Sequence, residues 1–173
     1  MDIDAVIDTH YRKIYKLSLF YLKDEQEAEE LTQEIFIKVL KKKSTFKGES
    51  SIYTWLYRIA VNTLINYINR KKIVEFISFE NIPHIKEEVH ESVDIETADP
   101  ASLLEKEELD RLRVEQLERC LRHLSNREKT AFYFFHYDGL KQKEIAEIMK
   151  TSVSAVESLV HKGMKKIKKC VGG

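Results

Sequence analysis

The sequence predicts an all-α protein of two small helical domains (an N-terminal helical bundle and a C-terminal helix-turn-helix domain) joined by an acidic flexible linker. Three observations support this fold class. Of the 173 residues, 43% are hydrophobic, which suffices for a folded core. Only five glycines and two prolines are present, which argues against a turn-rich sandwich or barrel. Apolar side chains recur every three to four positions, as on one face of a helix.

The first domain is expected to occupy residues 1–73. Helical spacing of apolar residues predicts three helices in it, over residues 3–22, about 24–43 and about 51–72. Asp24 and Glu27 have the spacing of a capping box at the start of the second helix. The segment STFKGESS between the second and third helices contains Gly48 and predicts a loop.

A linker is expected over residues 74–101, where the helical periodicity fails, acidic residues dominate and both prolines occur. The second domain then occupies residues 102–173. Its first helix is predicted to begin with Ser102 and Glu105 as a capping box and to run to Leu124. Three further helices are predicted, the first opened by a capping box of Ser125 and Glu128 and closed at Asp138-Gly139, the others over residues 141–149 and 152–169.

The formal net charge of zero conceals three segments of unlike charge. Residues 1–73 carry a net charge of +3, residues 74–110 carry −10 and residues 111–173 carry +7. Basic segments on either side of an acidic one suggest two nucleic-acid-facing domains joined by a segment that avoids nucleic acid. A solvated acidic linker without such a role explains the middle segment equally well.

The two cysteines, Cys120 and Cys170, form no C-x-x-C pair and therefore indicate neither a disulfide framework nor a cysteine-based zinc site. This suits a reducing compartment. Cys120 and His123 share one helical face and could form half of a metal site, but no second pair is visible. We therefore expect no cofactor and no metal.

Targeting and catalytic motifs are absent from the sequence. The acidic N-terminus does not resemble a signal peptide, and no apolar run approaches the ~18 residues needed to cross a membrane, so we expect a cytoplasmic protein without direct membrane insertion. No G-x-x-x-x-G-K loop, G-x-G-x-x-G fingerprint, H-E-x-x-H motif or nucleophile elbow is present, so we expect no enzyme.

The segment KQKEIAEIMKTSVSAVESLVHKG predicts a helix-turn-helix. The small Ala146 allows close packing of two helices, while Ile145, Met149, Val156 and Val160 fill the angle between them. Outward residues of the second helix could then face base edges while its lysines neutralise phosphates. An ordinary helical hairpin with a solvated lysine face is the alternative.

A second group of residues, at the start of the third helix, combines aromatic, basic and amide side chains. Aromatic rings stack unpaired bases, arginine and lysine follow the backbone, and asparagine can donate to and accept from a base edge. Such a mixture is typical of a single-strand binding surface. Trp55 and Tyr67 share the apolar stripe of the helix and are expected to be core residues rather than stacking platforms.

Three ordered blocks of the sequence resemble the extracytoplasmic-function sigma factors, the smallest members of the sigma-70 family of RNA polymerase sigma factors. The blocks are EAEELTQEIFIKVLKK, FKGESSIYTWLYRIAVNTLINYINRKK and LRHLSNREKTAFYFFHYDGLKQKEIAEIMKTSVSAVESLVHKGMKKIKK. Together with the linker they cover nearly the whole chain. The resemblance implies a transcription initiation factor that binds core RNA polymerase, directs it to specific promoters and captures flipped bases of the minus-ten element to open the duplex.

The resemblance also implies site residues. It implies that the polymerase clamp is bound by Asp24, Leu31, Gln33, Glu34, Phe36 and Lys38. It implies that the minus-ten element is recognised and melted by Phe46, Lys47, Gly48, Ser50, Arg58, Asn62, Asn66 and Arg70. It implies that the minus-thirty-five element is recognised by Ser152, Ser154, Glu157, Ser158, His161, Lys162 and Lys165. The acidic linker is expected to thread toward the polymerase active-site cleft and the RNA exit channel, and a partner anti-sigma protein is expected.

Many family members carry arginine or lysine where this chain has Glu157 and Leu159. DNA contacts of the last helix are therefore either fewer here or shifted toward Ser154, His161 and Lys162, unless Leu159 packs internally. Two other interpretations compete with the resemblance. One is a helix-turn-helix regulator that binds duplex DNA without polymerase and dimerises through its N-terminal helices, and the other is a helical interaction protein without a nucleic-acid function.

Overall fold

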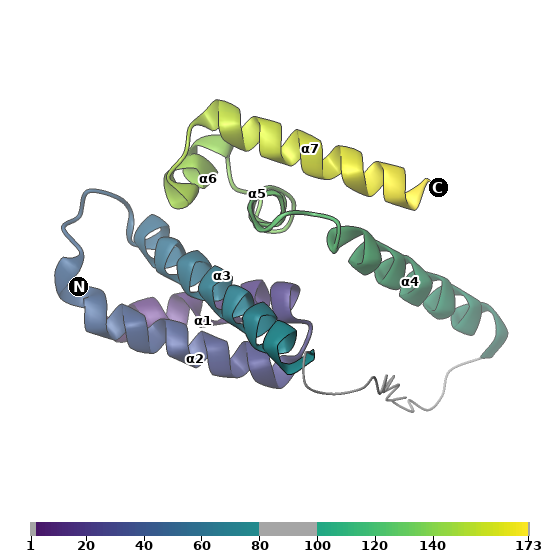
Figure 1. Ribbon diagram of the computed structural model, residues 1–173, viewed down its shortest axis with the longest axis horizontal. Coiled ribbons are helices and arrows are strands. Elements are labelled where there is room, and N and C mark those ends of the chain that lie inside the picture. The colour runs from purple at the N-terminus through teal and green to yellow at the C-terminus, as the bar shows by residue number, and fades with distance from the viewer. Residues whose placement is uncertain (1–2, 80–99, 173) are drawn as a thin grey trace.

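The computed structural model describes residues 3–79 and 100–172, and the side chains of residues 3–73 and 111–172 (Figure 1). Within these residues the chain forms seven α-helices, one short 3-10 helix and no strand, which confirms the all-α fold class. The helices are α1 (Ile3–Leu22), α2 (Glu25–Lys42), α3 (Ile52–Phe79), α4 (Pro100–Leu121), α5 (Asn126–His136), α6 (Gln142–Met149) and α7 (Val153–Val171), with the 3-10 helix η1 at Lys43–Thr45.

Helices α1, α2 and α3 form the N-terminal domain. The side chain of Asp24 accepts a hydrogen bond from the backbone N–H of Glu27 at 2.7 Å and caps α2. The other half of the predicted capping box does not form, because the Glu27 carboxylate pairs with Lys71 on α3 instead. Ser18 and Thr32 are buried where α1 meets α2, and their hydroxyl oxygens lie 3.2 Å apart. These small polar side chains satisfy each other, which permits close packing of the two helices. The surrounding core consists of fully buried side chains such as Ile14, Leu17, Leu31, Ile35, Leu56 and Leu64.

The helices extend into the predicted linker from both sides. Helix α3 continues to Phe79, because residues 74–79 contain neither the proline nor the glycine that would end it. Helix α4 begins at Pro100, since proline is favoured at a first helical position, where its missing N–H is not needed. Ser102 therefore lies inside α4 instead of capping it, which corrects the predicted start. The remaining linker residues, 80–99, lie outside the described residues.

The C-terminal domain is organised around α5. The hydroxyl oxygen of Ser125 accepts from the backbone N–H of Glu128, while the Glu128 carboxylate accepts from the backbone N–H of Ser125 at 2.8 Å. This confirms the predicted capping box. The same carboxylate is buried and forms an ion pair with the Nζ atom of Lys166 on α7 at 2.7 Å. One side chain thus caps α5 and fastens α7 across it.

Helices α6 and α7 form the predicted helix-turn-helix. Lys150 takes a left-handed conformation at φ 50° and ends α6, and Ser152 caps α7 by accepting from the backbone N–H of Ala155. Ile145 and Val156 are fully buried in the angle between the two helices. The residues expected to fill this angle therefore do so.

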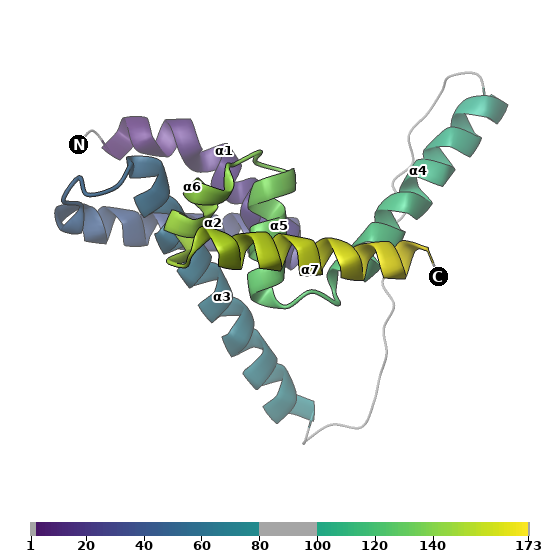
Figure 2. The same cartoon turned by 90° about the horizontal axis from the view of Figure 1, so that it is seen from above.

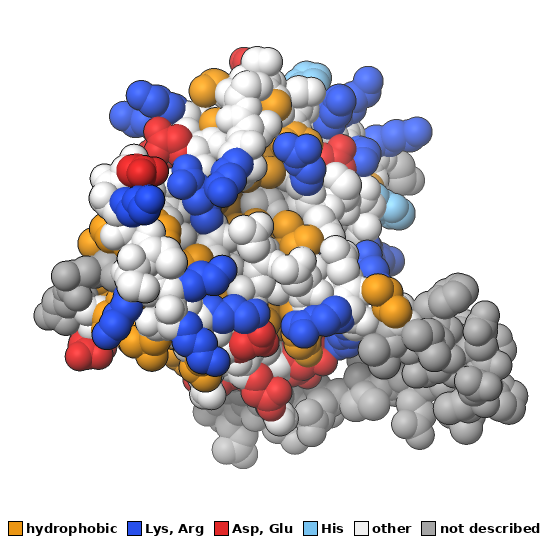
Figure 3. All heavy atoms as spheres, turned by 60° about the vertical axis from the view of Figure 1, so that its left-hand side comes forward, with side chains coloured by type: hydrophobic (Ala, Val, Ile, Leu, Met, Phe, Trp, Pro, Cys, Tyr) orange, Lys and Arg blue, Asp and Glu red, His pale blue; other side chains and the backbone are white. Residues whose placement is uncertain are grey.

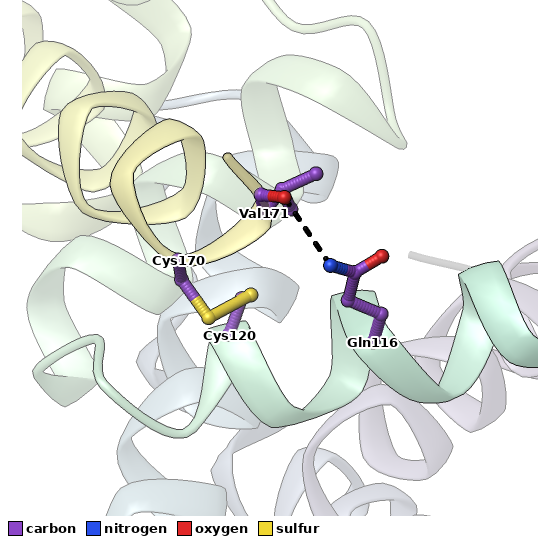
Figure 4. The surroundings of a disulfide bond; sticks show 4 residues. All are labelled: Gln116, Cys120, Cys170 and Val171. Atoms are coloured by element: carbon purple, nitrogen blue, oxygen red, sulfur yellow. Dashed lines mark hydrogen bonds between the residues drawn. A yellow bond between two sulfur atoms is a disulfide. The ribbon is translucent and has the colours of Figure 1, made fainter. Parts of the chain in front are cut away.

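A disulfide bond joins α4 to the end of α7, and the sequence did not predict it. Cys120 and Cys170 lie 50 positions apart in the chain, yet their Cα atoms are 5.6 Å apart (Figure 4). Spacing along the chain carried no signal of this pairing, because it arises only when α4 packs beside the last turns of α7.

The two domains pack directly against each other. Figures 1 and 2 show α5 and α6 lying against the N-terminal helices, while the start of α4 extends away from them, and in Figure 1 α7 lies on the far side of α5 and α6. The rings of Tyr57 on α3 and Phe134 on α5 are both fully buried, with centroids 5.2 Å apart. The hydroxyl of Tyr21 on α1 lies 2.5 Å from the hydroxyl of Thr130 on α5. Both domains therefore share one continuous apolar core.

Among the helices that the structure describes, none combines the length and the apolar character required to cross a lipid bilayer.

We expect the stability of the C-terminal domain to fall at acidic pH through Glu128. Burial alone would raise the pKa of Glu128, but hydrogen bonds from Lys166 and Ser125 outweigh it, so the pKa lies below the ordinary value of 4.5. The ionised Glu128 therefore stabilises the fold at pH values above its pKa in the unfolded chain. This stabilisation is lost as the pH falls through the lower pKa that Glu128 has in the folded chain. Glu128→Gln should lower the free energy of unfolding by about 1 to 2 kcal/mol near neutral pH. The melting temperature of this variant should also fall less steeply as the pH is lowered.

Circular dichroism melts between about pH 3 and about pH 7 would measure this effect. The matched control is Glu115→Gln, because Glu115 is exposed on α4 and its ion pair with Arg111, at 4.0 Å, lies on the surface. If the melting temperature of Glu128→Gln fell as steeply with decreasing pH as that of the unaltered chain, Glu128 would not be the source of the acid sensitivity.

Candidate nucleic-acid and polymerase interfaces

The loop after α2 presents an aromatic side chain on a supporting ring. Phe46 is half-buried, and its ring lies 5.4 Å from the ring of Trp55, measured between centroids, at an angle of 55°. Gly48 takes a φ of 75°, a left-handed conformation that favours glycine. The hydroxyl of Ser51 accepts from the backbone N–H of Thr54 and caps the start of α3. The loop is therefore held at Phe46 by the contact with Trp55 and at Ser51 by the cap of α3.

The first residues expected to contact the minus-ten element accordingly lie together, with Lys47 exposed and Ser50 half-buried beside Gly48. Trp55 and Tyr67 are half-buried and pack against the core. The structure places Trp55 beneath Phe46, where it supports the aromatic side chain of the loop.

A polar stripe runs along α3 from its first turns. Arg58, Asn62, Asn66 and Arg70 follow one another at intervals of four, which places them on neighbouring positions of one helix face. Asn62, Asn66 and Arg70 are exposed. Arg58 differs, because its Nε atom donates to the backbone carbonyl of Glu147 on α6 at 2.9 Å. The C-terminal domain therefore occupies one end of this stripe.

The residues expected to contact the minus-thirty-five element all lie on the exposed surface of α7 or at its N-cap. They are Ser152, Ser154, Glu157, Ser158, His161, Lys162 and Lys165. The hydroxyl of Ser152 is engaged in capping the helix. Lys166 is likewise engaged, since its ammonium pairs with Glu128. Leu159 is half-buried against the core, which settles the alternative left open by the sequence in favour of internal packing.

Helix α2 carries the residues expected to bind polymerase, but not all of them face outward. Leu31 and Phe36 are buried in the core of the N-terminal domain, so they support the surface without forming it. The remaining members of the set are Asp24, Gln33, Glu34 and Lys38. Glu34 and Lys38 form an ion pair at 2.6 Å, and Asp24 is the N-cap.

Sequence reasoning missed two residues of the exposed face of α2. Ile37 is 50% exposed and Leu40 is 40% exposed, although both are large and apolar. With Glu30 and Gln33 they fall at alternating intervals of three and four, the pattern of a coiled-coil seam. Their position out of phase with the buried stripe of Leu31, Ile35 and Val39 was the signal that could have found them.

Basic side chains are scattered over one face of the molecule. Figure 3 shows Lys and Arg side chains distributed over the face that lies on the left-hand side of Figure 1. At the contact between the domains, burial and then the neighbouring Lys23 lower the pKa of Lys129 to about 8, and its ammonium lies over the rings of Phe20 and Tyr21.

A cavity of about 720 Å³ opens between the two domains. It is lined by Lys13, Lys16, Leu19, Phe20, Lys23, Glu25, Glu118, Tyr133, Tyr137 and Asp138. At the edge of the cavity, the Nζ atom of Lys23, directly after α1, forms an ion pair with Glu118 on α4 at 2.7 Å. No three His, Cys, Asp or Glu side chains within the described residues come together in a way that could hold a metal ion.

Two sequence families match the chain, one in each domain. Sigma-70 region 2 matches residues 6–73, which span α1, α2 and the polar stripe of α3. Sigma-70, region 4 matches residues 114–167, which run from the end of α4 into α7.

Curated relatives extend across both domains. The ECF RNA polymerase sigma-E factor of Haemophilus influenzae is 34% identical over 141 residues, which cover 80% of this chain and 71% of the relative. The ECF RNA polymerase sigma-E factor of Escherichia coli K12 is 31% identical over 147 residues, covering 80% and 70%. The RNA polymerase sigma-H factor of Pseudomonas aeruginosa is 29% identical over 171 residues, covering 97% and 85%.

Two solved structures share the fold. The sigma factor RpoE, solved in complex with the anti-sigma factor NepR from Bartonella quintana, superposes with a TM-score of 0.69 at 19% identity, covering 99% of this chain and 97% of that one. CnrH, solved in complex with the cytosolic domain of CnrY, superposes with a TM-score of 0.66 at 14% identity, covering 98% and 87%. The likeness in fold thus extends through both domains.

We expect Tyr21→Phe to loosen the packing between the domains. The Tyr21 hydroxyl lies within hydrogen-bond distance of the Thr130 hydroxyl and of the Asn126 carbonyl on α5. Loss of one buried hydrogen bond costs about 1 kcal/mol, so the ratio of packed to separated domains should fall about fivefold. Single-molecule energy transfer between dyes on non-natural residues at the exposed positions of Lys43 and Lys168 would measure this ratio.

Tyr15→Phe is the matched control for that measurement, because Tyr15 lies on the same helix and its hydroxyl makes none of these contacts between the domains. Equal ratios in Tyr21→Phe and Tyr15→Phe would show that the hydroxyl does not hold the domains together.

Proposed function

This chain belongs to the sigma-70 family as an extracytoplasmic-function sigma factor, and we propose that its N-terminal domain opens promoter DNA by capturing flipped bases of the minus-ten element. As a sigma factor it is a transcription initiation factor that directs RNA polymerase to promoters, and it is not an enzyme. One juxtaposition supports the capture step. The Phe46 loop, held on Trp55, adjoins the exposed amide and guanidinium side chains of α3.

Binding energy alone can supply the opening step. Flipping a base out of the stack costs a few kcal/mol, whereas stacking or enclosing it returns about 1 to 3 kcal/mol per base. Capture of one or two bases therefore offsets local melting once polymerase holds the duplex. In this proposal Phe46, Lys47, Gly48 and Ser50 enclose the base while Asn62 reads its edge. A further set lies along the opened strand, namely Arg58, Asn66 and Arg70.

The two domains must separate for both promoter elements to be bound at once. The elements lie about two turns of DNA apart, roughly 70 Å at ~34 to 36 Å per turn, whereas α3 and α6 are in direct contact through Arg58 and Glu147. Twenty residues join α3 to α4, and at about 3.3 Å per residue they can span up to roughly 66 Å. Separation also frees the Arg58 side chain, which the proposal assigns to DNA.

We assign the docking of core RNA polymerase to the exposed face of α2. Gln33, Ile37 and Leu40 have the spacing of a coiled-coil seam and are exposed among the residues that the structure describes, and exposed apolar side chains at such spacing suit a helical partner. The helical polymerase clamp is a partner of that kind. Asp24, Glu34 and Lys38 lie on or beside the same helix and supply its polar rim, while the buried Leu31 and Phe36 hold the seam in place.

The C-terminal domain is proposed to read the minus-thirty-five element through α7. Ser154, Glu157, Ser158 and His161 point outward toward base edges in this proposal, while Lys162 and Lys165 neutralise phosphates. An acidic linker, proposed to thread toward the active-site cleft and RNA exit channel, would occupy a path later taken by a polyanion. RpoE and CnrH were each solved with a partner protein, which supports an anti-sigma partner here as well.

Run-off transcription tests the proposed function directly. Purified core RNA polymerase transcribes sheared genomic DNA of the source organism with and without this protein, and the transcript starts are mapped. We expect starts that depend on the protein and share two upstream elements about two helical turns apart, because each domain reads one element. No new starts, together with tight sequence-specific DNA binding by the protein alone, would instead favour a regulator that acts without polymerase.

Variants then test the capture of flipped bases on a promoter identified in this way. Phe46→Ala and Asn62→Ala should each lower the rate of promoter opening about 5-fold to about 150-fold, as expected for losing about 1 to 3 kcal/mol per captured base. Opening can be followed by the fluorescence of 2-aminopurine at the flipped position. Affinity for core polymerase should not change, because neither residue lies on the seam of α2.

Asn69→Ala is the matched control for this pair, because Asn69 is exposed on α3 about two turns beyond Asn62 and is not assigned to the flipped base. Loss of polymerase binding in Phe46→Ala or Asn62→Ala would refute the division of roles between the loop and α2.

A further inference from the structure

We propose that Cys120 and Cys170 form a reversible oxidation site, in which a hydroperoxide closes the disulfide, a dithiol reopens it, and closure fastens α4 to the end of α7. The pair is the whole cysteine content of the chain, so neither sulfur has a competing intramolecular partner. Both cysteines belong to the C-terminal domain, so oxidation of this site acts on that domain first.

The backbone of the two helices places the sulfurs for this reaction. The Cα atoms of Cys120 and Cys170 are 5.6 Å apart, within the range that accepts a disulfide without backbone movement. Figure 4 shows the Nε2 atom of Gln116 donating to the backbone carbonyl of Val171 beside the disulfide, at 3.3 Å. This hydrogen bond lies one turn before Cys120 and next to Cys170, so it holds the two helices in register there.

The two sulfurs differ in their access to solvent. Cys120 is fully buried, whereas Cys170 is half-buried on the last turn of the last helix. Reagents in solution therefore reach Cys170 first, and Cys120 is placed to resolve the product. Accessible disulfides are the labile ones, and disulfides in proteins that meet cellular thiol reductants are usually transient or redox-sensing. A sigma factor works beside RNA polymerase in such surroundings.

Oxidation proceeds in two balanced steps. The Cys170 thiolate attacks one peroxide oxygen, so that an S–O bond forms, the O–O bond breaks and hydroxide leaves to become water. The Cys120 sulfur then attacks the Cys170 sulfur, so that the S–S bond forms, the S–O bond breaks and a second water leaves. The two thiols lose two electrons and the peroxide gains them. A dithiol reverses the change in two steps: one of its thiolates attacks the Cys170 sulfur and releases Cys120, and its second thiolate then attacks the sulfur of the first, so that the mixed disulfide breaks, Cys170 leaves as a thiolate and the dithiol is left oxidised.

The bond forms where α4 leaves the body of the domain. Leu112 and Val114, one to two turns earlier, are exposed, and Figure 2 shows α4 extending away from the other helices. Beyond Cys120 the chain is anchored by the buried Leu121 and Leu124. The disulfide thus joins α4 covalently to α7 at the point where α4 begins to pack against the rest of the domain. Closure fixes α4, including Glu118, whose ion pair with Lys23 borders the cavity between the domains.

The experiment compares the full chain after hydrogen peroxide and after dithiothreitol. Peptide mass mapping should find the Cys120–Cys170 bond after peroxide and two thiols after dithiothreitol, under native conditions. Hydrogen exchange of residues 111–121 should become at least about 10-fold faster on reduction. The melting temperature should fall by at least about 8 °C, because a disulfide that closes a loop of this length constrains the unfolded chain.

Cys170→Ala is the variant for this test, since it removes the accessible thiol and leaves the core residue Cys120 in place. Its exchange rates and melting temperature should match those of the reduced chain and should not respond to peroxide. Resistance of the bond to dithiothreitol in the folded protein, failure of peroxide to form it, or equal exchange in the two states would each overturn the proposal. These measurements require neither promoter DNA nor polymerase, so their failure is distinguishable from failure of the proposed function.

Discussion

The packing of α5 against α1 and α3 is the contact on which the arrangement of the molecule depends. Phe134 lies fully buried beside Tyr57, and the ring of Phe20 lies 4.9 Å from that of Tyr133, measured between centroids. Aromatic side chains bury large areas and add favourable ring contacts, so a few of them suffice to join two small domains. Each of the two domains has limited apolar surface of its own, and the shared core enlarges what both can bury.

In the proposed function this contact also sets a cost for promoter binding. The packed arrangement places α6 over the first residue of the α3 stripe, and two promoter elements about two helical turns apart would be out of reach of packed domains. Under that proposal, binding to polymerase and DNA supplies the free energy that separates the domains, because a ligand shifts an equilibrium only by its differential affinity for the two states. An anti-sigma partner that favours packed domains would act on the same equilibrium in the opposite direction.

Charge has two distinct uses in the C-terminal domain. Lys166 pairs with the buried Glu128 and so joins α7 to the start of α5, whereas Lys162 and Lys165 remain exposed on the same helix. The net charge of this part of the chain could not distinguish the structural lysine from the free ones. Ser152 also has a structural role, because its hydroxyl oxygen accepts from the backbone N–H of Ala155 and caps α7.

The local pattern of the sequence determined the helices, the capping residues Asp24 and Ser125, the helix-turn-helix and, through three ordered motifs, the family. These features depend on neighbours within a few positions, which a sequence displays directly. Only the tertiary structure decided that Leu31 and Phe36 are core residues while Ile37 and Leu40 are exposed. It also decided that Arg58 is held by α6, that the two domains share a core, and that Cys120 meets Cys170. Each of these depends on residues distant in the chain, whose proximity is fixed by packing and leaves no periodic trace in the sequence.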